Sequence, residues 1–470
     1  MTISQEKAKY AIHDILIFEV GCLPSVYIKT LGCKVNAHDS FSLTSGFQKK
    51  GFGVAETASA ADIAIINTCS VTENSNRESR YLVRRYRKDN PDCFIVATGC
   101  YAQTHSADLN AIPELDFIVP NAAKNSLVDL VLDKFDKRDN ESNENASKIA
   151  DGHELVHNNR QGQFKTSLDL IEASISQTRA YLKIQDGCNG FCSYCLIPYA
   201  RGRSRSVDKE KVLSEMRRLL DIGLKEVVLT GIHIGDYGSD FEIGYTFKDL
   251  LEEILSLPNM VRVRISSFEP GELSYDLLQL MSRHKNMICD HFHLPLQSGN
   301  ARILKLMRRS YTPAEYAEKI SALREAFPVA NIGADVIPGF PSETDEEFED
   351  TKSFVERIGL NYLHVFPYSA RPNTAAVKMP GHLPPETVKK RTRTLIEVSN
   401  TLKNAYAQTF IGHTFPVLWE KQIDARGRRI GKSPNYLDIV CGAKDQPEPN
   451  TISHVRLHGF VEGTRLLSSP

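Results

Sequence analysis

This chain has too few cysteines for a disulfide scaffold, no long apolar run and almost no net charge. Ten cysteines in 470 residues are too few for a disulfide-stabilised secreted domain, and their local clustering is typical of metal ligation in a reducing compartment. No run approaches the ~18 apolar residues of a membrane-spanning helix. Lys and Arg total 57 against 58 Asp and Glu, so any nucleic-acid binding must come from local basic patches.

A secretory signal is also missing. The apolar stretch at residues 15–23 is interrupted by Glu19 and is preceded by Asp14 instead of a basic segment. We therefore expect a cytoplasmic protein with no membrane contact. The length and the 41% hydrophobic content predict roughly two to four domains.

The chain falls into five segments, the first being an extension over residues 1–25 to which we assign no function. Short apolar runs alternate with amphipathic stretches from residue 26, which predicts a small parallel α/β domain over residues 26–135. Residues 136–173 are rich in Asn, Asp, Glu and Lys and are predicted to be a linker. Residues 410–470 carry short alternating runs broken by Gly, Pro and Asn, which predicts a small antiparallel β barrel.

The central segment, residues 174–409, contains six apolar strand-like runs separated by helix-like stretches. This pattern predicts consecutive βα units, and six strands favour a partial (βα)6 barrel over a full barrel of eight. Polar residues and glycines at the strand ends should then gather on one face. In βα barrels that face carries the active site.

Three cysteines, Cys188, Cys192 and Cys195, lie close enough for one loop to hold three corners of a cubane iron-sulfur cluster. Three thiolates leave one iron open, and the amino and carboxylate groups of S-adenosylmethionine (SAM) can chelate it. An electron from the cluster can then break a carbon-sulfur bond of SAM to give a 5′-deoxyadenosyl radical. A structural zinc site is the alternative, but it usually needs four ligands in two spaced pairs, and the nearby sequence offers no fourth Cys and no close His.

A second set, Cys33, Cys69 and Cys100, falls at the ends of three apolar runs of the first domain. The ends of parallel strands line one edge of a sheet, so these thiols can converge on a second cluster. The alternative is that they are buried as small hydrophobic residues, which is the commoner case for isolated cysteines. The other four cysteines follow no such pattern and are interpreted as packing residues: Cys22, Cys93, Cys289 and Cys441.

Several long strings give the chain, from about Val26 to Leu467, a close resemblance to the methylthiotransferase family of radical SAM enzymes. They include TLGCKVNAHDS, NTCSVT, TGCYAQ, QDGCNGFCSYCLIPYARGRSRS, HLPLQSGN and ADVIPGFPSETDEEF. The resemblance implies that Cys33, Cys69 and Cys100 bind an auxiliary 4Fe-4S cluster, in addition to the cluster at the triplet. It also implies a TRAM domain, a small RNA-binding β barrel, from about Gly412.

Within the family, the strings LGCKVN, GIHIG and RISSFEP most resemble the branch that methylthiolates C2 of N6-threonylcarbamoyladenosine at position 37, next to the tRNA anticodon. Methylthiolation of isopentenyladenosine or of ribosomal protein S12 is the alternative, and a non-catalytic iron-sulfur RNA-binding module is a more distant one. The resemblance implies that one SAM methylates a sulfur at the auxiliary cluster and that a second SAM supplies the radical. It also implies flavodoxin or ferredoxin as electron donor. We expect a monomer.

Several further residues are candidates for SAM or substrate contacts. The resemblance implies that Tyr194 packs near the SAM adenine and that Thr230 and Gly231 lie near its amino group, with loop packing and a turn as the alternatives. Gln297 follows a strand and can reach SAM or the substrate base, unless it only caps the turn. In an extended segment Arg201, Arg203 and Arg205 would project to one side, and Arg203 is our candidate for holding a phosphate or the SAM carboxylate; a solvated face is the alternative.

Two basic segments are candidates for RNA contact. Residues 77–88 carry six basic side chains with Tyr81 and Tyr86 between them, although as one helix the segment could simply bury both tyrosines. The last domain concentrates positive charge in one turn, at Arg426, Arg428, Arg429 and Lys432. Asn373 departs from the glycine usual in the family, which puts the conformation of its loop in doubt.

Overall fold

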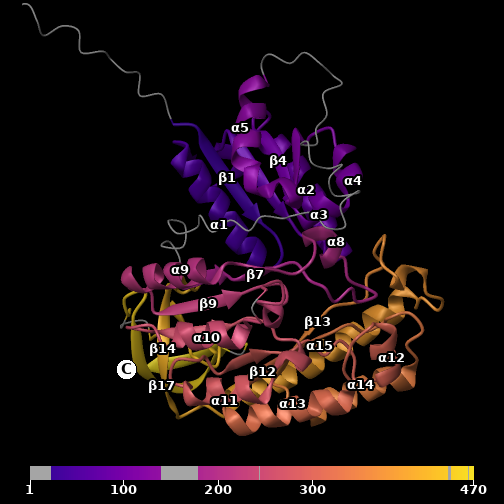
Figure 1. Cartoon of the computed structure of the whole chain (residues 1–470), viewed down its shortest axis with the longest axis vertical. Coiled ribbons are helices and arrows are strands. Elements are labelled where there is room, and N and C mark those ends of the chain that lie inside the picture. Colours follow the sequence, from indigo (N-terminus) through magenta and orange to yellow (C-terminus); the bar gives the residue numbers. More distant parts are fainter. Residues whose placement is uncertain (1–22, 139–177, 243, 443–445, 464, 470) are drawn as a thin grey trace, which may run out of the picture.

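The computed structural model describes residues 23–138, 178–242, 244–442, 446–463 and 465–469 (Figure 1). Most of the predicted extension and linker, and with them Cys22, lie outside these ranges. The described residues form a parallel α/β domain, a partial barrel and a small closed β barrel, which confirms the predicted fold class. No helix in these ranges is long and apolar enough to cross a membrane.

The N-terminal domain is a five-stranded sheet in the order β2-β1-β3-β4-β5, and all its pairings are parallel. Its strands are β1 Ser25–Thr30, β2 Gly53–Val54, β3 Ile63–Thr68, β4 Phe94–Gly99 and β5 Phe117–Pro120. Its helices are α1 Lys34–Lys49, α2 Glu73–Asp89, α3 Cys100–Thr104, α4 Ser106–Asn110 and α5 Leu127–Lys137. Every residue of β3 and β4 is buried because separate apolar clusters cover the two faces of the sheet.

The central domain contains the six predicted strands, which are β6 Ala180–Lys183, β9 Glu226–Thr230, β10 Arg262–Ile265, β11 His291–His293, β12 Asn331–Val336 and β13 Tyr362–Val365. They pair in parallel as β6-β9-β10 and β11-β12-β13, and a parallel bridge between Val263 and Ile288 joins the two groups. Among the described residues no pairing joins β6 to β13, so the barrel is open on that side.

Helices cover the outside of these strands (Figure 1). They are α9 Lys209–Asp221, α10 Phe247–Leu255, α11 Tyr275–Arg283, α12 Ala301–Leu306, α13 Pro313–Ala326, α14 Asp345–Arg357 and α15 Pro385–Gln408. Capping boxes start α13 and α14, where Thr312 pairs with Glu315 and Thr344 with Glu347. One large apolar cluster fills the space between the helices and the strands.

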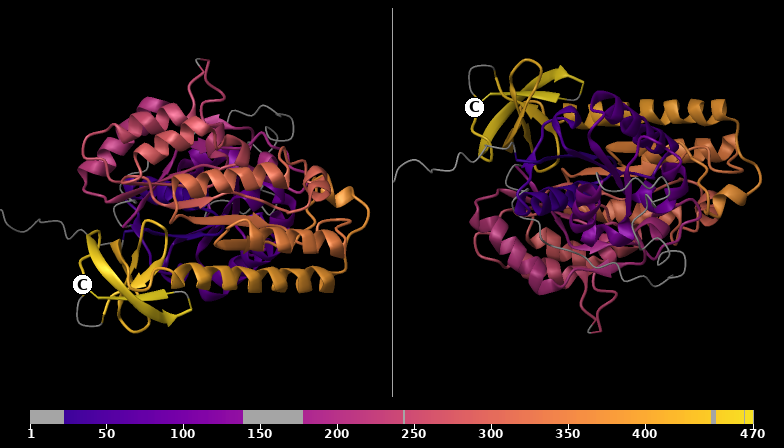
Figure 2. Two further views of the ribbon diagram at one scale, coloured as in Figure 1. Left: turned by 90° about the horizontal axis from the view of Figure 1, so that it is seen from below. Right: turned by 90° about the horizontal axis from the view of Figure 1, so that it is seen from above.

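The C-terminal domain is a closed five-stranded barrel beside the end of α15 (Figure 2). Its strands are β14 Thr414–Ile423, β15 Arg429–Lys432, β16 Asp438–Val440, β17 Ile452–Glu462 and β18 Arg465–Ser469. Four of the five pairings are antiparallel, as predicted, but β16 and β18 pair in parallel. The reason is that β17 lies between them in sequence. The chain reverses its direction before β17 and again before β18, so β18 runs in the direction of β16.

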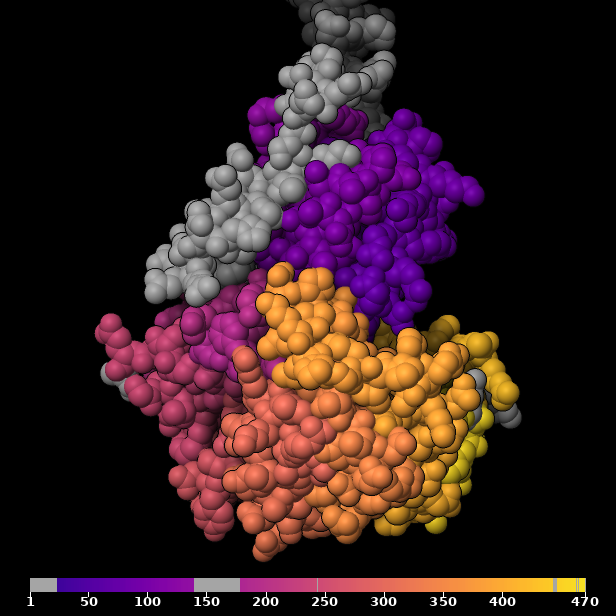
Figure 3. Space-filling view, turned by 90° about the vertical axis from the view of Figure 1, so that its right-hand side faces the viewer, coloured from indigo at the N-terminus to yellow at the C-terminus, as the bar shows by residue number. Residues whose placement is uncertain are grey.

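The three bodies contact one another through polar side chains. Arg264 of β10 forms a buried ion pair with Glu226 of β9 at 2.8 Å and donates to the carbonyl of Pro434 in the C-terminal barrel. Arg371, which follows β13, donates to the carbonyl of Ser70 in the N-terminal domain at 2.8 Å. In Figure 3 an orange part of the chain lies against the N-terminal domain. These contacts fix the N-terminal and C-terminal domains against the partial barrel.

Candidate active site

The cysteine triplet lies in the loop between β7 (Gln185–Asp186) and α8 (Ile197–Arg201). A Cβ atom added at Gly190 would lie 3.3 Å from Sγ of Cys188 and 3.8 Å from Sγ of Cys192, so these two sulfurs flank one backbone position. Burial, followed by the charge of Cys192, raises the pKa of Cys195 to about 12. The loop therefore brings the three thiols together, as the spacing predicts.

Gln185 fixes this loop against the end of β9. Its side-chain oxygen accepts hydrogen bonds from the backbone N–H groups of Ile232 and His233 at 3.0 and 2.9 Å. Its side-chain amide donates to the carbonyl of Gly187 at 2.8 Å. Gly187 has φ +77°, and a Cβ there would meet the carbonyl of Arg203 at 2.0 Å, so only glycine fits.

Hydrogen-bond donors surround the three sulfurs. Arg309 donates to Sγ of Cys192 at 3.2 Å, and the backbone N–H groups of Gly190 and Ile197 donate to Cys188 at 3.2 Å and to Cys195 at 3.4 Å. Such donors stabilise thiolates, the form that ligates iron. The donor set therefore fits an iron-sulfur cluster held by three cysteines.

His233 is a second cation beside the triplet. Its Nδ1 lies 3.6 Å from Sγ of Cys188, and its Nε2 lies 2.5 Å from a carboxylate oxygen of Glu272. Burial disfavours the charged imidazole, but the hydrogen bonds to Cys188 and Glu272 outweigh burial and raise the pKa of His233 to about 11. Sequence reasoning missed His233 and Arg309, because only the folded chain brings them to the loop. It missed the role of Gln185, because the bonds of its side chain to Ile232 and His233 form only on folding.

Tyr194 lies in the triplet loop and Gly231 beside it, and the roles predicted for Tyr194, Thr230 and Gly231 stay predictions. Tyr194 packs against the apolar cluster that contains Met307 and Phe340. Thr230 ends β9, and a Cβ at Gly231 would meet the side-chain oxygen of Gln185 at 2.9 Å. The close approach of the Gln185 side chain therefore explains the glycine at position 231 better than a turn does.

Gln297 adopts φ +66° and bridges in parallel to Val336 of β12. Its neighbours Ser298 and Gly299 contact Thr351 of α14 by hydrogen bonds of 3.2 and 3.0 Å. The two neighbours therefore hold this turn against α14, and the role of Gln297 stays a prediction.

The expectation that three arginines share one side is wrong. Arg201 and Arg205 both approach Asp186, at 3.0 and 4.0 Å, whereas Arg203 lies 5.5 Å above the ring of Phe191. The segment is not extended, because Arg201 ends helix α8 and Gly202 after it has φ +79°.

The second set of cysteines follows the carboxyl ends of three neighbouring strands. Cys33 follows β1 and caps α1, Cys69 follows β3, and Cys100 begins α3 directly after β4. Gly32 has φ +94°, and a Cβ there would lie 2.7 Å from Sγ of Cys69. Burial, followed by the charge of Cys100, raises the pKa of Cys69 to about 11, and Cys33 contributes as well. The structure thus brings these three thiols together, and the donor set again fits a three-thiolate cluster.

The three other described cysteines are buried, two of them in apolar cores. Cys93 belongs to the core beneath the first sheet, and Cys441 belongs to the core of the C-terminal barrel. Cys289 is 1% exposed, with Sγ 3.7 Å from a carboxylate oxygen of Glu226.

A polar cluster inside the partial barrel escaped sequence reasoning. Nε2 of His293 lies 2.9 Å from Asp335, and His364 lies 3.3 Å from the same carboxylate oxygen. The hydroxyl of Tyr362 joins His293 to His291 through contacts of 3.3 and 2.9 Å. The available signal was polar residues at alternate positions of β11, since alternate side chains of a barrel strand face inward.

The two basic segments are only partly free for RNA. Residues 77–88 do form one helix, in which Tyr86 is buried and Tyr81 is 58% exposed. In the turn of the C-terminal barrel, Arg428 pairs with Asp424 at 2.7 Å and Lys432 pairs with Asp438. Arg426 is exposed, and its side chain forms no ion pair with any residue that the structure describes.

Comparisons with known proteins agree with this geometry. Residues 182–355 match the radical SAM superfamily, and residues 25–120 match the uncharacterized protein family UPF0004. A solved structure of the radical S-adenosylmethionine methyltransferase TsrM from Kitasatospora setae has a similar fold, with a TM-score of 0.54 at 15% identity over 75% of this chain and 77% of that one.

Three curated relatives span most of the chain. The threonylcarbamoyladenosine tRNA methylthiotransferase MtaB of Bacillus subtilis is 36% identical over 89% of this chain and 90% of its own length, and that of Aquifex aeolicus is 39% identical over 88% and 96%. The tRNA-2-methylthio-N(6)-dimethylallyladenosine synthase of Acetivibrio thermocellus is 32% identical over 84% and 80%. The chain therefore belongs to the radical SAM methylthiotransferase family of enzymes, and this membership implies a 4Fe-4S cluster and SAM.

Proposed function

We propose that the protein methylthiolates C2 of N6-threonylcarbamoyladenosine at position 37 of tRNA, giving 2-methylthio-N6-threonylcarbamoyladenosine. The observation that supports the proposal is a pair of three-cysteine groups, one in the loop before α8 and one after the carboxyl ends of β1, β3 and β4. Threonylcarbamoyladenosine enzymes match this chain at 32–39% identity and dimethylallyladenosine enzymes at 31–35%, a small margin that favours the first substrate.

In this proposal Cys188, Cys192 and Cys195 hold one 4Fe-4S cluster, and Cys33, Cys69 and Cys100 hold a second. With SAM bound, the group held by Cys188, Cys192 and Cys195 would supply radical chemistry at C2, and the group held by Cys33, Cys69 and Cys100 would supply the sulfur. The chain itself stabilises the thiolates through Arg309 and His233. Tyr194, Thr230, Gly231, Gln297 and Arg203 would position SAM or the substrate base.

The proposed partners follow from this chemistry. The anticodon loop of tRNA is the substrate, and exposed cations of α2 and the C-terminal barrel would contact its phosphates. A low-potential donor such as flavodoxin or ferredoxin would supply electrons in the cytoplasm. We propose that a single chain carries the complete site.

Nucleoside analysis of tRNA from cells that lack the gene and then express it tests the proposal. We expect 2-methylthio-N6-threonylcarbamoyladenosine only with expression, and none with Cys192→Ala. Accumulation of 2-methylthio-N6-dimethylallyladenosine, or loss of methylthio from ribosomal protein S12 alone, would contradict the proposed substrate.

A second measurement separates the two cysteine sites. Cys192→Ala should abolish formation of 5′-deoxyadenosine from SAM in anaerobically reconstituted protein. Cys69→Ala should still form 5′-deoxyadenosine but transfer no methylthio group. Equal loss of 5′-deoxyadenosine in both variants would show that the second site is not a separate sulfur site, and no SAM cleavage by the unaltered protein would favour a non-catalytic RNA-binding module.

A further inference from the structure

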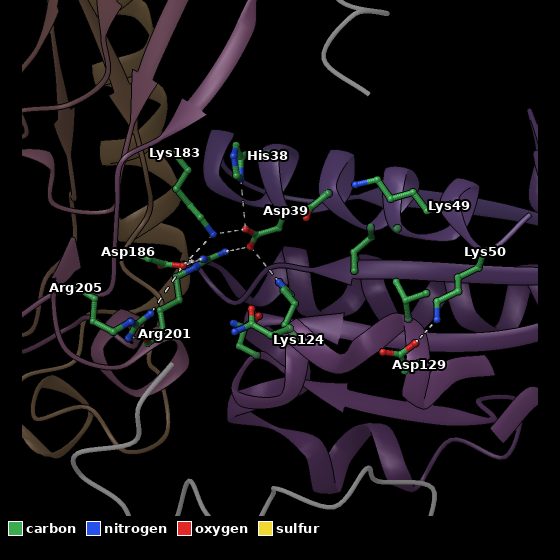
Figure 4. Close-up of a pocket in the computed structure, with 16 residues that line it drawn as sticks. His38, Asp39, Lys49, Lys50, Lys124, Asp129, Lys183, Asp186, Arg201 and Arg205 are labelled. Atoms are coloured by element: carbon green, nitrogen blue, oxygen red, sulfur yellow. Dashed lines mark hydrogen bonds and ion pairs between the residues drawn. The ribbon is translucent and has the colours of Figure 1, made fainter. Parts of the chain in front are cut away.

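Arg201 lies between the two cysteine sites and is linked to both through neighbouring polar side chains. It ends α8, six positions after Cys195, and its side chain is 2% exposed. Its guanidinium donates to both carboxylate oxygens of Asp186 at 3.0 Å and to a carboxylate oxygen of Asp39 in α1 at 3.1 Å. Figure 4 shows these side chains converging between the two domains.

Asn36 links Arg201 to the loops of Cys33 and Cys69, two of the three auxiliary cysteines. Its side-chain oxygen accepts a hydrogen bond from Arg201, and its amide donates to the carbonyls of Leu31 at 2.8 Å and Thr68 at 3.0 Å. Leu31 lies two residues before Cys33, and Thr68 lies directly before Cys69. One side chain therefore holds the two loops in place and is itself held by Arg201.

Asn121 makes the corresponding connection to the third cysteine. Its amide donates to the carbonyl of Ala200 at 3.0 Å and lies 3.7 Å from Sγ of Cys100. The dipeptide Ala200-Arg201 thus contacts the surroundings of all three auxiliary cysteines. It does so from the same short segment that follows the cluster loop of the barrel.

The charges around Arg201 do not cancel. Arg205 is also attracted by Asp240, but the four cations Lys124, Lys183, Arg201 and Arg205 form their ion pairs here with two carboxylates, Asp39 and Asp186. All six line a pocket of about 240 Å³ between the domains. The surplus positive charge lies beside the auxiliary thiols, since Arg201 acts electrostatically on Cys33 and Cys100.

We infer that Arg201 is a positioning residue shared by both cysteine sites, which holds the loops of Cys33 and Cys69 in register with the barrel loop and raises the reduction potential of the auxiliary cluster. The inference rests on the proposed function, because it requires a cluster at Cys33, Cys69 and Cys100. A reduced cluster carries more negative charge than an oxidised one, so a neighbouring cation favours reduction.

The test uses the full-length chain with Cys188, Cys192 and Cys195 all replaced by Ala, so that only the auxiliary cluster titrates. After anaerobic reconstitution, its midpoint potential is measured by EPR-monitored redox titration. Arg201→Gln should shift the potential to a more negative value, whereas Arg201→Lys should keep it close to the starting value. Asp39→Asn should shift it to a more positive value, because the same cations lose a counter-charge.

Arg201→Gln and Asp39→Asn should shift the midpoint potential in opposite directions. Damage to the fold would shift the potential of both variants in the same direction, so the two signs distinguish an electrostatic role from damage. Lys50→Gln is the matched control, because Lys50 lines the outer part of the same pocket and pairs with Asp129 at 2.9 Å. An unchanged potential in Arg201→Gln, or shifts of equal sign in Arg201→Gln and Asp39→Asn, would overturn the inference. If the triple-Ala background bound no iron at Cys33, Cys69 and Cys100 after reconstitution, the proposed second cluster itself would be overturned.

Discussion

Arg309 donates a hydrogen bond to the Sγ of Cys192 at 3.2 Å and pairs with Glu269 on its other side. The two residues are 117 positions apart in sequence, and the side chain of Arg309 is only 6% exposed. A buried guanidinium therefore faces a thiolate of the triplet, where it compensates the negative charge of the ligand set.

Replacing this arginine should weaken the triplet site without removing a ligand. We expect Arg309→Gln to lower the rate of 5′-deoxyadenosine formation from SAM by about 10- to 100-fold, the range usual for partners of metal ligands. The matched control is Arg308→Gln, because Arg308 is exposed and contacts none of the three cysteines in the described residues. An unchanged rate in Arg309→Gln would contradict the role given to this hydrogen bond.

Arg264 should be the most sensitive point of the contact with the C-terminal barrel. It is fully buried, pairs with Glu226 and donates to the carbonyls of Ser433 and Pro434. Arg264→Ala leaves the Glu226 carboxylate buried without this partner, so we expect the free energy of unfolding to fall by about 3–5 kcal/mol in urea titrations. Arg217→Ala, on the exposed face of α9, should change it by less than about 0.5 kcal/mol.

Glu215 should make stability depend on pH. Burial raises the pKa of Glu215 from 4.5 to about 7, so the native state keeps a proton that the unfolded chain releases between these values. The free energy of unfolding contributed by this group therefore falls as pH rises from 4.5 to 7. Glu215→Gln has no proton to release, so its free energy of unfolding does not fall in this way. At pH 8 it should exceed that of the natural chain by roughly 1–3 kcal/mol, and at pH 4.5 the two values should be close.

Urea unfolding at both pH values measures this difference. Glu210→Gln, on the exposed side of the same helix, should show the same difference from the natural chain at both pH values. A Glu215→Gln difference that does not change with pH would show that this carboxyl titrates normally.

Arg426 should contribute more to RNA affinity than its neighbour Arg428. Arg428 is held by Asp424 at 2.7 Å, whereas Arg426 is exposed at the tip of the turn. We expect Arg426→Gln to weaken binding of a tRNA anticodon stem-loop and to reduce the slope of log affinity against log salt by about 1. Arg428→Gln should change that slope less, and equal effects of the two substitutions would contradict this assignment.

The strands could be predicted because buried parallel strands appear as short continuous apolar runs, and six such runs became β6 and β9 to β13. The two cysteine sets could also be predicted, one from its spacing and the other from the strand ends. The parallel pairing of β16 with β18 could not, because it depends on the path of β17 between them.

By itself the sequence determined the order of the three domains, the six cysteines and the family, since each of these lies in local patterns of residues. Only the tertiary structure decided what surrounds the cysteines. Arg201 meets Asp39 across 162 positions and Arg309 meets Cys192 across 117, and no local pattern encodes such contacts. These contacts form because a charged group buried away from water needs a partner. The folded domains decide which residue lies close enough to be that partner.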